Sequence, residues 1–410
     1  MTRHAQQRVR CNAPTPGTSG NAHALPHVYL DNAATTRPYP EVVACMTEAM
    51  QACYANASAP HLLGRQAHDL LEASRAVVAE SLGADPEEVY FTSGGTEANN
   101  LAIGGAHGAA CPERDLLVTT ALEHPSVTKA ARDLKRRGFP VRYCNAPHGE
   151  LDLQQLAEAL SGGRVALVSV MAVQNVFGYL FPLDEVARLR DQLSPDTLLH
   201  SDAVQAYGKL LLRPAEQGIE LLSVSGHKIG GPKGVGALYV RAGTRLFATA
   251  FGGGQERGLR SGTEAVPQIA GFAEAVRITF GRRHESLQRM RDLRQRLLSQ
   301  LESAFAGVVV NSRPDGIPSI VHFSLPGTDN DRVVSKLGER GVYVGISAAC
   351  DTNHIRPNEP IRAKHPTVAL LAGVRPQLER SSYRVSLSAQ NTNADIDALV
   401  TALKEVTPYG

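Results

Sequence analysis

The sequence predicts an α/β fold, built on a mostly parallel β-sheet with helices on both of its faces. Short apolar stretches alternate along the chain with longer stretches in which apolar residues recur at helical spacing. Several of the short stretches run directly into polar loops, as at Thr92, Asp202 and Ser225. In open parallel sheets, ligands bind beyond the carboxyl ends of the strands. We therefore expect these polar residues to gather around a ligand at one edge of the sheet.

The composition limits which classes of protein this chain can belong to. The chain has 410 residues, of which 43% are hydrophobic, so it is long enough for a large core and more than one domain. The net charge of +2 argues against a general affinity for nucleic acid or membranes. No apolar run approaches the roughly 20 residues that a membrane-spanning helix needs. We expect neither a nucleic acid nor a membrane as a direct partner.

The six cysteines are scattered, and none of them has CxxC or zinc-site spacing. We therefore expect no metal site within this chain. Reduced thiols in a cytoplasmic protein are the simplest interpretation.

Residues 1–27 contain no Asp or Glu and are rich in Arg, Pro, Gly, Ser and Asn. They lack the apolar segment of a secretory signal. We expect a disordered basic tail, and an organelle-targeting role is the alternative.

The other elements follow from local pattern. Apolar runs of strand length predict strands over residues 28–30, 89–92, 116–120, 164–173, 317–325, 342–350 and 381–387, with another ending at Asp202. Helical spacing predicts helices over residues 40–52, 64–82, 266–304 and 395–406, and another beginning within residues 93–100.

Residues 221–240 have apolar ends and a polar, Gly-rich centre, which predicts strand, loop and strand. A lysine at the end of a buried strand is desolvated, which lowers its pKa and frees a nucleophilic amine. On an extended chain, Ser225 and His227 share one face and Lys228 takes the other. One face then suits an anion and the other a carbonyl carbon, as pyridoxal 5'-phosphate (PLP) requires. The alternative is an exposed lysine in a Gly-rich hairpin.

Two further strand ends favour this cofactor. Asp202, if buried, would pair with a protonated pyridine nitrogen. Gly94 and Gly95 let the backbone approach a ligand closely, and Thr96 lies near a helix start, where free N–H groups favour a phosphate. An ordinary Gly turn with a Thr cap is the alternative.

Four motifs, in order along the chain, resemble those of the cysteine desulfurases in the class V aminotransferase family. They are YLDNAAT at 29–35, SGGTEANN at 93–100, SGHK followed by GPKGVGALYV at 225–240, and GGGQERGLRSGT at 252–263. The third is close to the family's Schiff-base signature. The resemblance extends from about residue 28 to the C-terminus.

The resemblance implies the PLP-dependent transferase fold of type I. A large PLP-binding domain, residues 42–283, would contain a mostly parallel sheet of the seven-stranded type. Residues 28–41 and 284–410 would form a smaller α+β domain that carries the sulfur-accepting cysteine.

The resemblance also implies roles for individual residues. Lys228 would hold PLP as a Schiff base, and His124 would stack on the ring and move protons during catalysis. Asp202 would pair with the ring nitrogen. Gln205 would bond the phenolic oxygen of PLP, and Asn175 would bond either that oxygen or the substrate carboxylate.

The phosphate site implied by the resemblance combines Gly95, Thr96, Ser225 and His227. Thr263 would reach the phosphate bound to the other subunit, which makes the protein a homodimer with shared sites.

The segment after residue 173 departs from the family. Families of this type read close to NNETG where this chain has QNVFG at 174–178. Asn175 and Gly178 match, whereas Gln174, Val176 and Phe177 differ, and Ala172 replaces a common polar residue. We expect the departures to affect substrate detail or partner choice more than the core chemistry.

The sulfur chemistry would depend on Cys350. The family carries its sulfur-accepting cysteine on a mobile loop in the segment SSGSAC, and this chain has GISAAC at 345–350, followed by a polar loop. An inert buried thiol is the alternative interpretation.

The function implied is that of a PLP-dependent cysteine desulfurase. Arg384 would pair with the carboxylate of L-cysteine, which becomes L-alanine while Cys350 becomes a persulfide. An acceptor protein would take the sulfur for iron–sulfur cluster assembly, tRNA thiolation or DNA phosphorothioation. The alternatives are another class V PLP enzyme (a selenocysteine lyase, a C–S lyase or an aminotransferase) and a non-catalytic sulfur-carrier scaffold.

Overall fold

The computed structural model describes residues 27–346 and 367–409. The predicted tail therefore lies outside the described residues, except for its last residue, and Cys350 lies outside them as well. Within the described ranges, no helix combines the length and the apolar character needed to cross a membrane.

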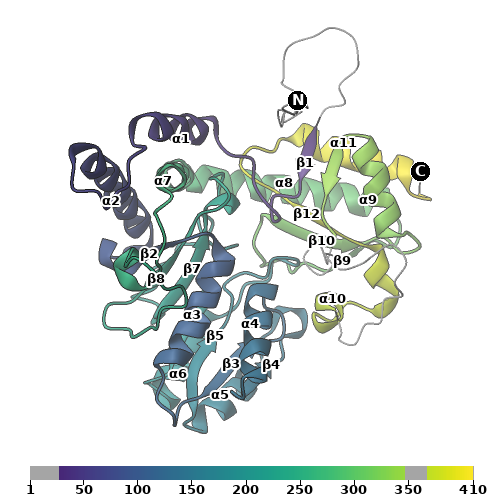
Figure 1. The fold of residues 1–410 in the computed structure, drawn as a ribbon. Helices are drawn as coiled ribbons and strands as arrows, with labels where there is room; N and C mark the ends of the chain where they lie inside the picture. The colour runs from purple at the N-terminus through teal and green to yellow at the C-terminus, as the bar shows by residue number, and fades with distance from the viewer. Residues whose placement is uncertain (1–26, 347–366, 410) are drawn as a thin grey trace, which may run out of the picture.

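A seven-stranded sheet occupies the centre of the larger half of the molecule, in the order β2-β8-β7-β6-β5-β3-β4 (Figure 1). Its strands are β2 (Val89–Thr92), β3 (Leu116–Thr120), β4 (Val141–Cys144), β5 (Val165–Ser169), β6 (Leu198–Asp202), β7 (Leu221–Ser225) and β8 (Gly236–Val240). Only β8 runs against its neighbours, β7 and β2. The predicted mostly parallel sheet is confirmed.

Helices cover both faces of this sheet. On one face, Leu117, Leu167 and Leu221 pack against α3 (Gly95–Ala109) and α4 (Pro125–Arg136). The next residue along each strand points the opposite way, into a core shared with α1 (Pro40–Ala52), α2 (Leu62–Leu82), α5 (Leu153–Ser161), α6 (Leu183–Leu193) and α7 (Val266–Gly281). Burial on both faces explains why these strands are apolar throughout.

A second unit has its own core. The antiparallel sheet β12-β10-β9 and the parallel pair β1-β11 pack with three helices (Figure 1). The strands are β1 (Val28–Leu30), β9 (Val309–Val310), β10 (Ile320–Ser324), β11 (Val342–Val344) and β12 (Ser382–Ser386), and the helices are α8 (Arg283–Ala304), α9 (Asn330–Glu339) and α11 (Asn393–Val406). The short α10 (Val368–Leu371) lies at the edge of the large cavity described below. The predicted domain boundaries near residues 42 and 284 stay a prediction.

Some predicted boundaries are wrong. The helix expected over residues 266–304 is two helices, α7 and α8, which meet at Arg282. The strand expected over 164–173 ends at Ser169. The extended chain expected at 225–228 is also wrong, because Gly226–Lys228 form one 3-10 turn closed by the bond from Ile229 N to Gly226 O. The alternation of faces predicted for His227 and Lys228 therefore does not apply.

Candidate active site

A cavity of about 710 Å³ lies where the parallel strands of the large sheet end. The segments that follow β2, β3, β5, β6 and β7 line it, as expected for a sheet of this topology. It brings together these predicted site residues: Gly95, Thr96, His124, Asn175, Asp202, Gln205, Ser225, His227, Lys228 and Arg384. Thr263 does not line this cavity of its own chain and is exposed.

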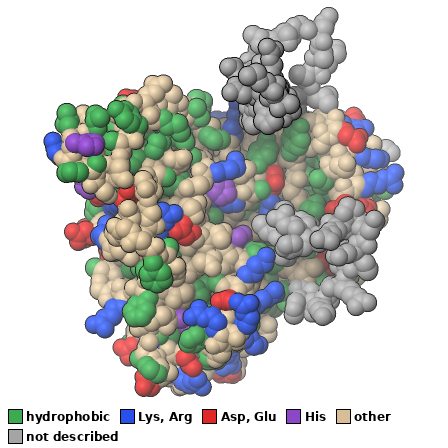
Figure 2. Space-filling view, in the orientation of Figure 1, with side chains coloured by type: hydrophobic (Ala, Val, Ile, Leu, Met, Phe, Trp, Pro, Cys, Tyr) green, Lys and Arg blue, Asp and Glu red, His purple; other side chains and the backbone are tan. Residues whose placement is uncertain are grey.

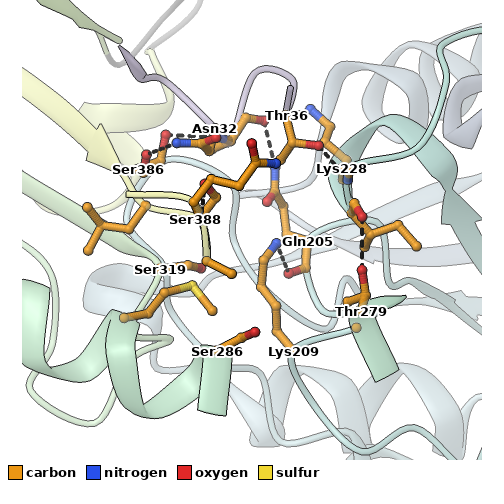
Figure 3. A pocket seen from close by; sticks show the side chains of 18 of the residues that line it. Asn32, Thr36, Gln205, Lys209, Lys228, Thr279, Ser286, Ser319, Ser386 and Ser388 are labelled. Carbon is orange, nitrogen blue, oxygen red and sulfur yellow. Dashed lines mark hydrogen bonds between the residues drawn. The ribbon is translucent and has the colours of Figure 1, made fainter. Parts of the chain in front are cut away.

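Lys228 lies in the wall between this cavity and a second, much smaller one. Its Nζ donates to Ala33 O at 2.6 Å and to Ala34 O at 2.7 Å. The small cavity, of about 50 Å³, lies between Lys228, Gln205 and Lys209 (Figure 3). Since a buried water needs about 10–15 Å³ by this measure, it has room for a few waters only. Of the two cavities that Lys228 borders, only the large one has room for a cofactor of the size of PLP.

Lys209 shares the small cavity with Lys228, and its Nζ donates to Gln205 O at 3.1 Å. Burial, and then the positive charge of Lys228, lowers the pKa of Lys209 to about 7. None of the described residues that line the small cavity is acidic. No motif in the sequence pointed to this second amine.

The start of α3 forms a cradle suited to an anion. Its N-cap is Gly94, at φ 145°, and no side chain caps the helix, so the first N–H groups are left for a ligand. A Cβ on Gly95 would lie 2.5 Å from Val204 Cγ2, so the backbone approaches this wall as only glycine allows. Across the cradle, Ser225 Oγ is buried without a hydrogen-bond partner among the described residues. These donors fit a phosphate group.

His227 extends this cradle as a neutral imidazole. Burial, followed by the charges of Lys228 and Lys233, lowers the pKa of His227 to about 4. Its Nδ1 lies 3.2 Å from Thr35 Oγ1, which fixes the ring.

Asp202 is buried at the end of β6, and each of its carboxylate oxygens accepts an N–H. Asn99 Nδ2 donates to Oδ2 at 2.6 Å, and Val204 N donates to Oδ1 at 3.0 Å. A carboxylate held in this way suits a protonated ring nitrogen as its partner. Asn99 also donates to Ser126 Oγ at 2.8 Å, which ties Asp202 to the start of α4.

His124 is the N-cap of α4, and its ring orientation is set by Ser126. The ring Nδ1 accepts from Ser126 N at 3.1 Å and lies 2.7 Å from Ser126 Oγ. The imidazole lines the large cavity. Such a ring can contact a planar ligand and exchange protons with it.

Arg384 comes from β12 in the second unit, and its side chain is almost fully buried. Its Nη2 donates to Asp31 Oδ1 at 2.7 Å, and its Nη1 donates to Asn175 O at 3.1 Å. Its Nε has no partner among the described residues. Arg384 lines the cavity, where a guanidinium suits a carboxylate as its partner. Asn175 contributes its backbone to this arrangement, while its side chain lines the cavity.

Asp31, Asn99, Glu123 and Lys209 were missed as site residues. Asp31 lies within the YLDNAAT motif, and Glu123 directly precedes His124. These positions in the sequence could have identified both residues. Asn99 lies within the SGGTEANN motif, whereas for Lys209 the position in the tertiary structure is the only evidence. Cys350 lies outside the described residues, and the described cysteines Cys45, Cys53, Cys111 and Cys144 do not line the cavity.

The mostly parallel sheet, with a lysine, an anion cradle and a buried aspartate at its strand ends, defines a protein of the PLP fold type I class. The model of the family "Aminotransferase class-V" matches residues 28–399. The chain belongs to this family.

Its relatives are cysteine desulfurases. It is 37% identical over 383 residues to the IscS-like cysteine desulfurase of Mycobacterium tuberculosis, with 92% of this chain and 95% of the relative covered. A solved structure titled NifS-like protein superposes with a TM-score of 0.85 at 30% identity, over 93% of this chain and 99% of that one. A structure of SspA in complex with cysteine superposes with a TM-score of 0.75 at 29% identity, over 89% and 99%.

Proposed function

We propose that this protein is a PLP-dependent cysteine desulfurase. The observation that carries the proposal is the single cavity that joins Lys228, the anion cradle of α3, Asp202 and Arg384. The names of its relatives, and the complex of SspA with cysteine, support L-cysteine as the substrate.

PLP fits the donors of the large cavity. Its phosphate would be held by the N–H groups of Gly95 and Thr96 and by two side chains, Ser225 and His227. Asp202 would bind the ring nitrogen, and His124 would contact the ring. Gln205 and Asn175 would lie near the phenolic oxygen. The cofactor supplies an electron sink for the carbon atom bonded to the substrate nitrogen.

The protein's own groups then have distinct tasks. Lys228 would provide the amine that holds the cofactor, and the same amine could carry a proton. Arg384 orients the substrate carboxylate. The Cys350 thiolate attacks the substrate sulfur, so that an S–S bond forms, the carbon–sulfur bond breaks and alanine leaves.

The described chain leads toward Cys350 from a place beside Arg384. Gly345 N donates to Arg384 O, and Arg384 N donates to Gly345 O, both at 2.9 Å. Cys350 follows Gly345 by five positions in the sequence and lies outside the described residues, and its role as sulfur acceptor is part of this proposal. We propose that an acceptor protein takes the persulfide sulfur from there.

We also propose a homodimer in which Thr263 completes the phosphate site of the other subunit. Thr263 is exposed at the end of a loop that includes Phe251, itself 87% exposed. Figure 2 shows hydrophobic side chains at the surface over α1 and α2, where Met50, Tyr54 and Leu62 are exposed. A second copy of the chain would cover such a surface.

Incubation of the purified protein with PLP, L-cysteine and a reductant tests the function. We expect alanine and sulfide in equal amounts. Cys350→Ala should keep the absorbance of the bound cofactor and lose sulfide production, and Cys144→Ala, at a buried cysteine away from the cavity, is its matched control. A protein that binds PLP but releases no alanine would contradict the proposal.

The segment after Val173 favours one alternative, another class V enzyme such as a selenocysteine lyase, a C–S lyase or an aminotransferase. There Val176 and Phe177 replace polar residues expected from the family, and Val176 lines the cavity. Such an enzyme would not need Cys350. Full cysteine turnover by Cys350→Ala would favour this alternative.

A further inference from the structure

Glu123 is a buried carboxyl group that the proposed mechanism does not use. It follows β3, lines the large cavity and is 4% exposed. Its Oε1 accepts from Thr120 Oγ1 and from Met171 N, both at 2.9 Å. Its Oε2 is buried and has no donor among the described residues. A charge on this group would thus be poorly solvated on one side.

Asp202 lines the same cavity but is bonded differently. Both of its oxygens accept an N–H, from Asn99 and from Val204. Two carboxylates in one buried site repel each other, so the better-bonded one keeps its charge. By this comparison Glu123 is the group that takes up a proton more readily. A proton on Oε2 removes the uncompensated negative charge there.

We propose that Glu123 is an uncharged positioning residue, which leaves Asp202 as the carboxylate, among the described residues, that acts on the ring nitrogen of the cofactor. The inference rests on the function proposed above. By staying uncharged, Glu123 keeps a second negative charge away from Asp202. Such a charge would change how tightly the ring nitrogen of the cofactor holds its proton.

The titration of Glu123 agrees with this geometry. Burial raises the pKa of Glu123 to about 8, against the bond from Met171 N, and the charge of Asp202 adds to the rise. The other charged or titratable groups around the cavity are Glu97, His124, Arg132, His227, Lys228, Lys233 and Arg384. Of the groups that line the cavity, Asp202 is the one whose charge shifts the pKa of Glu123.

Infrared spectroscopy of the cofactor-free protein tests the protonation directly. At pH 7 we expect the C=O stretch of a protonated carboxyl group, which disappears with a midpoint near the pKa of about 8. The band should be missing in Glu123→Gln. Glu97→Gln is the matched control, because Glu97 lines the same cavity but is paired with Arg260 at 2.7 Å. Burial alone would raise the pKa of Glu97, yet its bonds to Arg260 and Ser93 lower it overall, so this variant should keep the band.

Thermal unfolding across pH gives a second readout. Glu123 binds its proton more tightly in the folded than in the unfolded protein, so its contribution to stability falls as pH rises from 4.5 to about 8. Glu123→Gln removes this dependence. The melting temperature of Glu123→Gln minus that of the wild type should therefore increase by on the order of 5 °C between pH 5 and pH 8. Glu123→Ala, which leaves Thr120 and Met171 N unpaired, should be destabilised at both values.

The enzyme loaded with PLP supplies the third readout. The Gln side chain in Glu123→Gln is uncharged and has nearly the shape of a protonated Glu side chain. Cysteine turnover at pH 7 should therefore stay within about fivefold of the wild type. The absorbance of the bound cofactor should change near pH 8 in the wild type but not in the variant. A missing infrared band at pH 7, or a loss of turnover of about 100-fold in Glu123→Gln, would overturn the inference. Failure to bind PLP would instead overturn the proposed function, because the first two readouts need no cofactor.

Discussion

Asp31 and Gly345 together fix the orientation of Arg384. Asp31 Oδ1 pairs with Arg384 Nη2 at 2.7 Å. A Cβ on Gly345 would lie 2.7 Å from Asp31 Oδ1 and 2.8 Å from Arg384 Nη2, so only glycine leaves room for this ion pair. The guanidinium is thereby held beside the cavity, with its Nε packed against Gly345.

We predict that Asp31→Asn weakens cysteine binding more than it slows turnover. The variant loses the charge that orients Arg384, and hydrogen bonds between charged groups are worth about 1.5–3 kcal/mol. KM for cysteine should rise about 10- to 100-fold with a smaller change in kcat, as steady-state kinetics would measure. Asp196→Asn, at an exposed partner of Arg114, is the control. An unchanged KM would show that Asp31 does not position Arg384.

The residues that depart from the family motif have local structural roles. Gln174 Oε1 accepts from Val176 N at 2.6 Å and from Phe177 N at 2.8 Å, which closes the turn. The ring of Phe177 packs 4.3 Å from that of His322, between centroids. The substituted residues therefore act together: Gln174 closes the turn, and the ring of Phe177 packs the turn against the second unit.

At the scale of elements, the Gly-rich loop, residues 251–263, is held in a strained conformation by buried contacts. Glu256 and Arg257 have φ values of 47° and 53°, in the left-handed region. Glu256 accepts from Arg75 Nη1 at 2.8 Å and from Phe91 N at 2.7 Å. Arg257 donates to Val89 O and lies over the ring of Tyr90. These contacts offset the backbone cost, which is on the order of 1–3 kcal/mol per residue.

We predict that Arg75→Met destabilises the protein and weakens PLP binding. Removing one partner of a buried ion pair costs about 3–5 kcal/mol, because the other charge stays buried. Urea unfolding should show a loss of this order, and the Gly-rich loop with Thr263 should lose its position. The control is Arg142→Met, which breaks the exposed pair with Glu158 and should cost about 1 kcal/mol or less. Equal losses of stability in the two variants would contradict the idea that the pair of Arg75 with Glu256 holds the Gly-rich loop in place.

At the scale of the whole molecule, the cavity lies where the two units meet. Arg384 and Asp31 belong to strands or turns of the second unit, although 353 residues separate them. Lys228, Asp202 and the α3 cradle come from the large sheet. The proposed substrate and cofactor sites thus depend on how the two units pack, and the proposed dimer adds Thr263 from a second copy.

Mixed dimers test whether Thr263 acts across subunits. Lys228→Ala and Thr263→Ala homodimers should each lose most of their turnover. In a mixed dimer, the subunit that keeps Lys228 would receive an intact Thr263 from its partner, so one of the two sites should recover. Turnover after subunit exchange would measure this. If Thr263 serves its own chain instead, no site in the mixed dimer is complete and turnover stays low.

The sequence by itself determined the alternating strands and helices and the motifs that gather at the strand ends. It could do so because hydrophobic periodicity and turn-forming residues act over a few neighbouring positions. The family resemblance also named ten of the residues that line the cavity, among them Gly95, Lys228 and Arg384. The tertiary structure decided the rest: the turn that directs Lys228, the pairing of Asp31 with Arg384, and the unpaired oxygen of Glu123. Hydrogen bonding and desolvation depend on segments far apart in the chain, so no local pattern encodes them.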